Sequence, residues 1–334
     1  MLKALAHIIR IAGSQSPISR SLIDQTQDIN IKLLGEERAG RVSSNIQLRS
    51  SDDMFKSVLR MLWDELVKPV INFLDVKKSD EMTVLQWCPT GHFTFLPIHA
   101  AGCYDDELAI DCAPDYFISS YTPAIGALLA LDSAPTTQPF QMMAVIQSKG
   151  LPSTRRELEN IRRRVPCEAL VELGVPGVPA GVEAVASRLS NMSIVHFACH
   201  GNQDPWKPLD SGLKLDDGLL RISRIMKEKM PNGSLAFLCA CETAMGDQNL
   251  PDEAMSIGAS LIFSGFRQVV ATVWKMMDED GPTIVDAFYE ELFFGGPDGR
   301  PALKPDMTKS ALALHLAVKK LRSQGVSFRR WVAF

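Results

Sequence analysis

The second part of the chain alternates between two kinds of apolar pattern. From residue 139 onward, short apolar runs of strand length are separated by segments whose apolar residues recur at helical spacing. The pattern predicts strands over 140–146, 169–173, 193–199, 235–241 and 269–274, and helices over 154–164, 181–189, 253–266, 282–294 and 310–323. Because helices that alternate with strands cover both faces of a sheet, we predict an α/β fold with a mostly parallel sheet.

The first part of the chain follows a less regular pattern. Residues 1–50 are polar and indicate a helix plus a linker, and residues 54–75 have apolar positions on one helical face, with Pro69 expected to kink or split that helix. Shorter elements are then predicted as strands over 83–88, 93–96 and 116–121 and as a helix over 123–131. The stretch D-S-A-P-T-T-Q-P at 132–139 favours a domain boundary there.

Composition narrows the class of protein. The 334 residues are 46% hydrophobic and 22% charged, with a net charge of −4, as in globular proteins. No basic stripe indicates direct nucleic-acid binding, and no apolar run reaches the ~18 residues that a membrane span needs. The odd number of cysteines, 7, favours free thiols and a reducing compartment, so we expect a cytoplasmic protein.

The first 22 residues allow two interpretations. They contain Lys, Arg and Ser but no acidic residue, a composition that also suits a mitochondrial transit peptide. The apolar residues Ala4, Ile8, Ile9 and Ile11 favour a short amphipathic helix instead.

The main chemical signal lies at the ends of two predicted strands. V-H-F-A-C-H-G at 195–201 closes on His200 and Gly201, and L-C-A-C-E-T at 238–243 contains Cys241. The carboxyl ends of parallel strands meet at one edge of a sheet, where ligands bind. In a thiol hydrolase, a cysteine thiolate attacks the substrate carbonyl and an imidazole transfers protons. The Gly201 N–H is suited to donate a hydrogen bond to the oxyanion that forms.

Other interpretations of these residues remain open. His196 lies inside its strand and is predicted to be a hydrogen-bonded core histidine, while Cys239 and Cys241 share a strand face and also fit small buried apolar residues. A zinc site is disfavoured because Cys199 points away from the histidines and C-x-C on a strand is not zinc-knuckle spacing. We expect no metal and no cofactor, since no nucleotide-binding or zinc-protease motif is present.

Several motifs together resemble a known family. H-F-A-C-H-G and C-A-C-E-T resemble the paired motifs of the CHAT domain, a caspase-like, separase-like clan CD cysteine peptidase module. The resemblance extends to W-C-P-T-G-H-F-T-F-L-P-I-H-A-A-G (87–102), S-S-Y-T-P (119–123), L-P-D-E-A (250–254) and A-T-V-W-K-M-M-D-E-D (271–280). It covers roughly residues 55–334, in the version found in fungal tetratricopeptide–CHAT proteins. The upstream repeats are absent, and relatives run further than R-W-V-A-F, which suggests an incomplete final strand.

The resemblance implies roles for particular residues. His200 is the implied catalytic histidine and Cys241 the nucleophile, with the N–H groups of Gly201 and Cys241 as the oxyanion hole. The family's caspase-like sheet further implies an inactive caspase-like half at 55–135 and an active half at 139–334, which leaves the helical or linker segment at 1–54 before them.

Substrate selection is less clear from the resemblance. In basic-specific relatives an Asp precedes the nucleophile by two residues and lines the first pocket, and Cys239 stands at that position here. Asp278, with Glu279 and Asp280, supplies negative charge in one interpretation and caps a helix in the other. Trp274 is either a pocket wall or a core residue.

The resemblance implies a cysteine endopeptidase that hydrolyses a protein substrate and is regulated by a protein partner, in defence or cell-death signalling. Residues 202–234 and 244–252 are the loops expected to become ordered on activation, and 202–234 contains the turn-rich D-P-W-K-P-L-D-S-G. The alternatives are a non-catalytic CHAT scaffold that acts by protein–protein contact, and a thiol acyltransferase on the same dyad.

Overall fold

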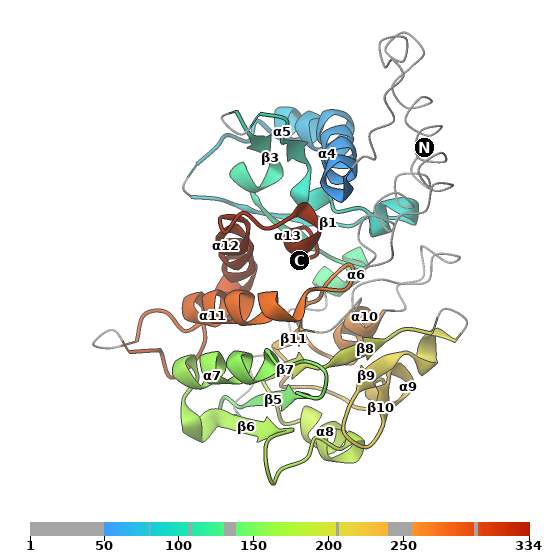
Figure 1. Ribbon diagram of the computed structural model, residues 1–334, viewed down its shortest axis with the longest axis vertical. Coiled ribbons are helices and arrows are strands. Elements are labelled where there is room, and N and C mark those ends of the chain that lie inside the picture. The colour runs from blue at the N-terminus through green and yellow to red at the C-terminus, as the bar shows by residue number, and fades with distance from the viewer. Residues whose placement is uncertain are drawn as a thin grey trace.

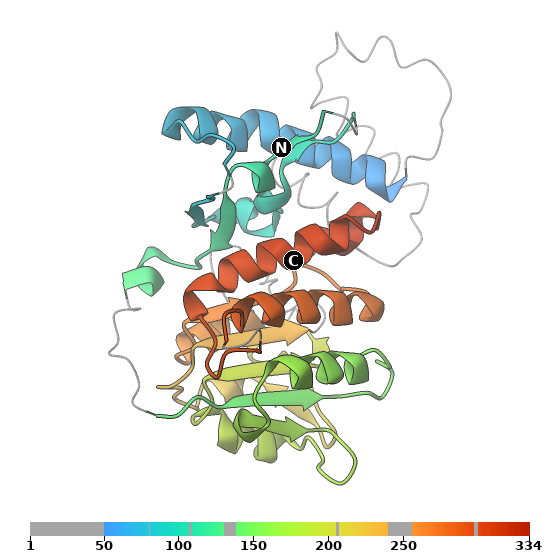
Figure 2. The same ribbon diagram turned by 90° about the vertical axis from the view of Figure 1, so that its left-hand side faces the viewer.

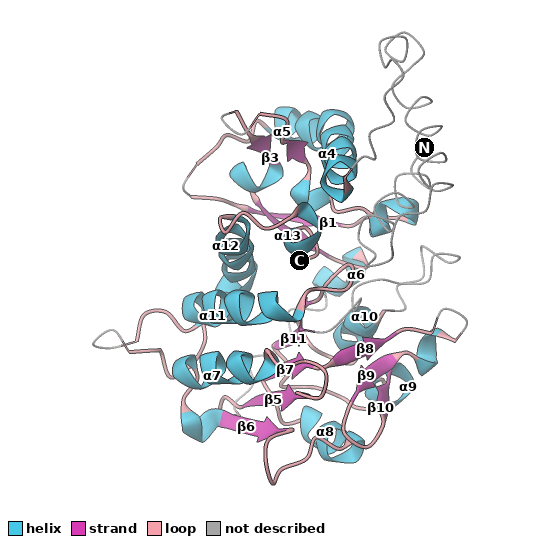
Figure 3. Ribbon diagram, in the orientation of Figure 1, coloured by secondary structure: helices cyan, strands magenta, loops and turns pink. Residues whose placement is uncertain are grey.

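A five-stranded parallel sheet forms the centre of the larger part of the molecule (Figures 1 and 3). The computed structural model describes residues 50–79, 81–106, 109–129, 138–204, 207–239, 256–296 and 300–334. The strand order is β12-β11-β7-β5-β6, and every neighbouring pair is parallel. The strands are β5 Met142–Ile146, β6 Leu170–Leu173, β7 Ile194–Ala198, β11 Leu235–Cys239 and β12 Gln268–Val270. This topology confirms the predicted α/β fold class.

Helices cover both faces of the sheet, because successive side chains of each buried strand point to opposite sides. One core contains Ile194 and Phe237 with the helices α7 (Thr154–Arg164), α11 (Gly281–Leu292) and α12 (Ser310–Arg322). The opposite core contains Val195 and Leu238 with α8 (Val182–Leu189), α9 (Ile222–Ile225) and α10 (Ile257–Phe263). Figure 2 shows α11 and α12 stacked between the sheet and the part of the chain that precedes it.

The preceding part, residues 50–129, is called the N-terminal unit below. Its first helix is α4 (Ser51–Leu62), which begins with a capping box in which Asp53 N–H donates to Ser50 Oγ at 3.1 Å. The predicted break at Pro69 takes the form of a π-helical turn over Trp63–Val67, followed by α5 (Lys68–Leu74). Proline has no N–H to donate, so the helix changes its hydrogen-bond pattern just before it.

The strands of the N-terminal unit form two small sheets. The strand β1 (Val84–Trp87) is parallel to β4 (Ile118–Tyr121), and β2 (Gly102–Cys103) is antiparallel to β3 (Asp111–Cys112). The predicted helix at 123–131 is present as α6 (Ile125–Leu129). The predicted strand at 93–96 is wrong, because Gly91–Phe95 is a 3₁₀ helix that begins at a glycine with φ +56° and ends two residues before Pro97.

One continuous apolar core joins the N-terminal unit to the sheet. It includes Phe55 of α4, Phe288 of α11 and Trp331 of α13 (Phe328–Trp331), so the chain's last helix packs on its first described one. The predicted boundary between 55–135 and 139–334 stays a prediction, and this core extends across it. Within the described ranges, no helix has the length and apolar character needed to cross a membrane.

The described residues of the segment after β7 contain short strands, where the sequence indicated a loop over 202–234; its ordering on activation stays a prediction. It forms an antiparallel sheet of three strands, β8 (His200–Asn202), β9 (Gly212–Lys214) and β10 (Leu219–Arg221), followed by α9. In strands of only three residues, the alternation of apolar and polar positions is too short to distinguish a strand from a turn. The other predicted loop, 244–252, lies outside the described residues.

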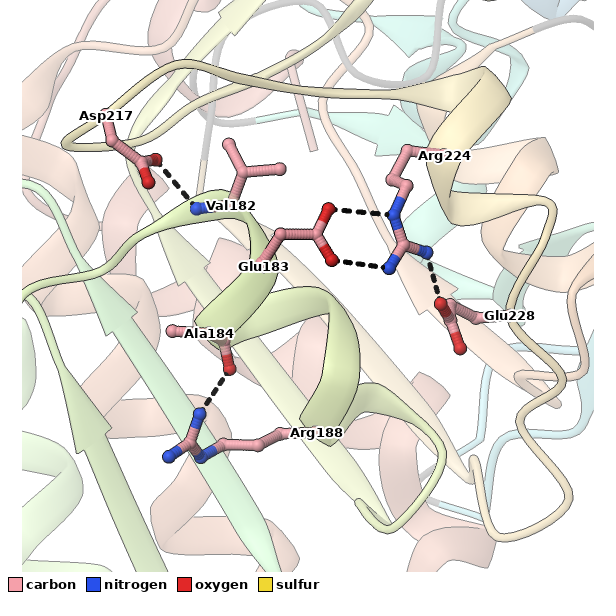
Figure 4. A network of polar contacts seen from close by, with 7 residues as sticks. All are labelled: Val182, Glu183, Ala184, Arg188, Asp217, Arg224 and Glu228. Atoms are coloured by element: carbon pink, nitrogen blue, oxygen red, sulfur yellow. Dashed lines mark hydrogen bonds and ion pairs between the residues drawn. The ribbon is translucent and has the colours of Figure 1, made fainter.

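Hydrogen bonds and ion pairs connect this small sheet and the helix that follows it to α8 (Figure 4). Asp217, in the turn between β9 and β10, accepts the Val182 N–H at 2.7 Å with its Oδ1. Arg224 of α9 donates to both carboxylate oxygens of Glu183, at 3.1 and 2.9 Å, and also pairs with Glu228. A bidentate arginine–carboxylate pair has a defined geometry, so it holds α9 at a set position against α8.

A neutral histidine connects the N-terminal unit to the C-terminus, and we therefore expect the stability of the fold to depend on pH. His99 Nε2 lies 3.2 Å from the Val332 carbonyl oxygen and Nδ1 lies 2.9 Å from the Tyr121 hydroxyl. Burial lowers the pKa of His99 from 6.5 to about 4. Between pH 4 and pH 6.5 the unfolded chain therefore binds more protons at His99 than the folded protein does. The stability that comes from neutral His99 is complete above pH 6.5 and is lost as the pH falls toward 4.

We expect the free energy of unfolding to fall by at most about 3 kcal/mol from this group across that range. Urea unfolding at pH 7 and pH 4 measures this fall, and the His99→Gln variant should show a smaller difference between the two pH values. Equal differences in the wild type and the variant would contradict the assignment.

Candidate active site

His200 lies at the start of a new strand rather than at the end of the old one. The strand β7 ends at Ala198, the chain bends at Cys199, and His200 begins β8 by pairing with Lys214. The strand predicted over 193–199 is thus present as Ile194–Ala198, and His200 lies beyond its end. A Cβ added at Gly150, in the loop after β5, would lie 3.4 Å from His200 Nε2. The imidazole thus faces the loop at the carboxyl edge of the sheet.

The two predicted catalytic residues follow neighbouring strands in register. The strands β7 and β11 are adjacent and parallel, and Ala198 is paired with Cys239. His200 comes two residues after one member of this pair and Cys241 two residues after the other. Cys241 itself lies outside the described residues, so its role, and the oxyanion hole of Gly201 and Cys241, stay predictions.

Cys239 is buried at the end of β11, with 5% of its surface exposed. Its Sγ lies 3.6 Å from Met276 Sδ. Burial, together with the nearby Glu157 carboxylate, raises the pKa of the Cys239 thiol well above its usual range. The thiol therefore stays protonated at neutral pH, and a protonated thiol is a poor nucleophile. Its predicted part in substrate binding stays a prediction.

A network of buried polar side chains lies beneath this strand end. His196 is fully buried, its Nε2 lies 3.2 Å from Glu157 Oε2, and its Nδ1 lies 3.1 Å from the Tyr289 hydroxyl. Burial raises the pKa of Tyr289 well above its usual range, so the phenol keeps its proton and donates to Nδ1 while Nε2–H donates to Glu157. The prediction of a hydrogen-bonded core histidine at 196 is confirmed.

Glu157 is 2% exposed and rests against the first turn of α11. A Cβ added at Gly281 would overlap Glu157 Oε1 and would lie 3.2 Å from Cys239 Sγ, so only glycine lets the carboxylate come this close. The helix N-terminus favours the negative charge. The sequence interpretation missed Glu157, although one signal existed: position 157 shares a helical face with the buried residues Leu158 and Ile161.

The loop after β12 holds the other two predicted substrate-binding residues. Trp274 is 5% exposed, its Nε1–H donates to the Arg329 carbonyl at 2.8 Å, and its ring lies 5.4 Å from that of Phe55. These are the contacts of a core residue, and they lend no support to a pocket wall. Asp278 Oδ2 accepts the Ser153 N–H at 2.9 Å, which links this loop to the one after β5.

Asp280 differs from its predicted role as a helix cap. It precedes α11, but its side chain makes no capping bond and instead accepts from Arg330 Nε at 3.1 and 3.0 Å. With 1% exposure it is a buried carboxylate whose partner lies 50 positions away in the sequence. Among the residues that the structure describes, no three His, Cys, Asp or Glu side chains are grouped to hold a metal ion.

Solved structures with low similarity include a separase and gingipains. The chain is 13% identical to separase in the Saccharomyces cerevisiae separase–securin complex, with a TM-score of 0.47 over 98% of this chain and 20% of that one. It is 8% identical to the Arg-specific cysteine proteinase gingipain R (TM-score 0.49; 88% of this chain, 68% of that one). It is 10% identical to a chain in the complex of Porphyromonas gingivalis RgpB pro- and mature domains (TM-score 0.47; 89% and 69%).

The family is shown by a sequence model. No curated protein matches the chain. The model of the CHAT domain, in contrast, matches residues 56–329, which is most of the 334 residues. The chain therefore belongs to the CHAT domain family.

Proposed function

We propose that this protein is a cysteine endopeptidase that hydrolyses peptide bonds of a protein substrate through Cys241 and His200. The observation that carries the proposal is the register of β7 and β11, in which Ala198 pairs with Cys239 and each is followed two residues later by one member of the dyad. Membership of the CHAT family supports the same chemistry.

The proposed reaction is acyl transfer. The Cys241 thiolate attacks the peptide carbonyl carbon, and the developing oxyanion accepts hydrogen bonds from the N–H groups of Gly201 and Cys241. His200 then protonates the leaving amine as the C–N bond breaks, which leaves a thioester. His200 next takes a proton from water, the water oxygen attacks the thioester, and the acid product and free thiol are released.

Substrate selection is proposed to involve the residues around the end of β11. Cys239 is uncharged, so simple preference for Arg or Lys does not follow from that position. Asp278 is the acidic side chain among the three proposed residues, and its link to Ser153 keeps it at the carboxyl edge of the sheet. On this proposal, Trp274 affects substrate binding indirectly, because its core contacts fix the position of the loop that carries Asp278.

Regulation and location are the broader parts of the proposal. We propose an activating protein partner and a role in defence or cell-death signalling on the basis of the family alone. A cytoplasmic location is proposed from the odd number of cysteines, 7.

The first experiment measures the alkylation rate of each cysteine against pH by mass spectrometry. We expect Cys241 to label with a pKa well below the usual ~8.5 because an adjacent imidazole stabilises a thiolate. Cys239 should label slowest, since its thiol is buried beside a carboxylate. The exposed residues Cys88 and Cys167 serve as references.

The matched variant is His200→Ala, which should return the Cys241 profile to that of Cys88 and Cys167. Two results would count against the dyad: a Cys241 profile equal to the references in the wild type, or a low pKa that persists in His200→Ala.

A further inference from the structure

The last residues of the chain hold the loop at the edge of the sheet. We call residues 327–334 the C-terminal segment and residues 273–280 the edge loop. The Val273 N–H donates to the Ala333 carbonyl at 2.8 Å, and the Trp274 Nε1–H donates to the Arg329 carbonyl at 2.8 Å. The first half of the edge loop is therefore attached to the backbone of the C-terminal segment.

Arg330 attaches the second half. Its Nε donates to both oxygens of Asp280, at 3.1 and 3.0 Å, its Nη2 also donates to Asp280, and Nη2 lies 2.8 Å from Glu279 Oε1. Asp280 is 1% exposed. A buried carboxylate is stable only when it is paired, so the position of Asp280 depends on this guanidinium.

The part of the edge loop that Arg330 holds borders the proposed site. Met276 Sδ lies 3.6 Å from Cys239 Sγ, two residues before Cys241. Asp278 accepts the Ser153 N–H from the loop after β5. The segment 276–280 thus extends from the end of the strand that leads to the nucleophile to the loop that faces His200.

The C-terminal segment is itself anchored on its other side. The Phe328 N–H donates to Asp52 Oδ1 at 3.1 Å, and the Val332 carbonyl lies 3.2 Å from His99 Nε2. Phe328 also packs edge-on against Tyr104, with ring centroids 5.1 Å apart. These contacts with the N-terminal unit hold the backbone from which Arg330 extends.

We propose that Arg330 is a positioning residue, which holds segment 276–280 of the edge loop in place beside the end of β11. The inference rests on the proposed function for its catalytic consequence, whereas its structural part is independent of activity. Arginine is needed here because its planar fork binds both carboxylate oxygens, which a lysine ammonium does not do.

The test compares amide hydrogen exchange in the full-length wild type and in Arg330→Gln, Arg330→Lys and the matched control Arg300→Gln, whose parent side chain is exposed. We expect Arg330→Gln to speed exchange in peptides covering 276–280 at least tenfold, with β7 and β11 unchanged. Arg330→Lys should give an intermediate increase, and Arg300→Gln none.

Two exchange results would overturn the proposal. Unchanged exchange at 276–280 in Arg330→Gln would show that Arg330 does not hold the loop. An equal increase in β7 and β11 would show a general loss of stability instead of local positioning. Arg330→Lys, which keeps the positive charge beside Asp280, decides the question if Arg330→Gln does not fold.

The catalytic consequence is measured with a fluorogenic peptide library that contains every residue at the cleaved position. In Arg330→Gln we expect KM to rise at least tenfold while kcat stays within threefold, since the loop borders Cys239 and contributes no reacting group. A fall in kcat alone would contradict this. A wild type without turnover would count against the proposed peptidase, and the exchange experiment would still decide the role of Arg330.

Discussion

The Cys241→Ala variant is expected to lose peptide hydrolysis by a factor of about 10⁴ or more. Alanine has no atom that can form the thioester, and the remaining oxyanion donors and substrate contacts account for only a small residual rate. The initial rates of cleavage of a peptide library by the wild type and the variant measure this loss.

The controls are Cys88→Ala and Cys167→Ala. Both should keep cleavage within about tenfold of the wild type, because both cysteines are exposed and neither belongs to the proposed site. Equal turnover in Cys241→Ala and the wild type would refute the peptidase mechanism.

The same variant separates the two classes of function. A scaffold keeps its protein partners and its cellular effect in Cys241→Ala, whereas a peptidase keeps its partners and loses the effect. An acyltransferase would transfer the acyl group to an added amine in the wild type, and the variant would not.

The Glu157→Ala variant is expected to destabilise the fold by about 2–4 kcal/mol, because a buried donor is left without its acceptor and a cavity forms. Without the carboxylate, the Nε2–H of His196 has lost its acceptor in a fully buried site, and a cavity is left beside Gly281. Urea unfolding measures the change, provided that the slope of the transition stays the same.

The exposed neighbour on the same helix provides the control, since Glu159→Ala should change stability by no more than about 0.5 kcal/mol. The coupling is tested with His196→Phe alone and combined with Glu157→Ala. Because the two side chains are in contact, the double variant should lose less stability than the sum of the single variants. Additive losses would show that the Glu157–His196 contact contributes little.

Local patterns were sufficient for most of the main sheet. The helix predicted over 154–164 has those bounds, and the helix predicted over 310–323 ends one residue earlier, at Arg322. The strands β5, β6, β7 and β11 lie within their predicted ranges. Helical spacing and apolar strand length are properties of neighbouring residues, so these elements could be predicted from sequence. The same holds for the buried role of His196.

One error is local, because the apolar run at 93–96 forms a 3₁₀ helix that begins at Gly91 and ends before Pro97. The other arises where partners lie far apart in the sequence, since the short strands β8–β10 depend on pairing with one another and on anchors to α8. Local periodicity carries no information about such long-range pairing.

For the candidate site, the sequence alone places a histidine motif after one buried strand and a cysteine motif after another, and it identifies the family of the chain. The three-dimensional structure was needed to show that β7 and β11 are neighbours in register, so that the chain leads to His200 and Cys241 from adjacent points. It also decided that Glu157 is a buried partner of His196 and that Asp280 pairs with Arg330. Burial and long-range ion pairs depend on how elements pack, whereas the helices and the longer apolar strands of the main sheet follow from the spacing of neighbouring residues.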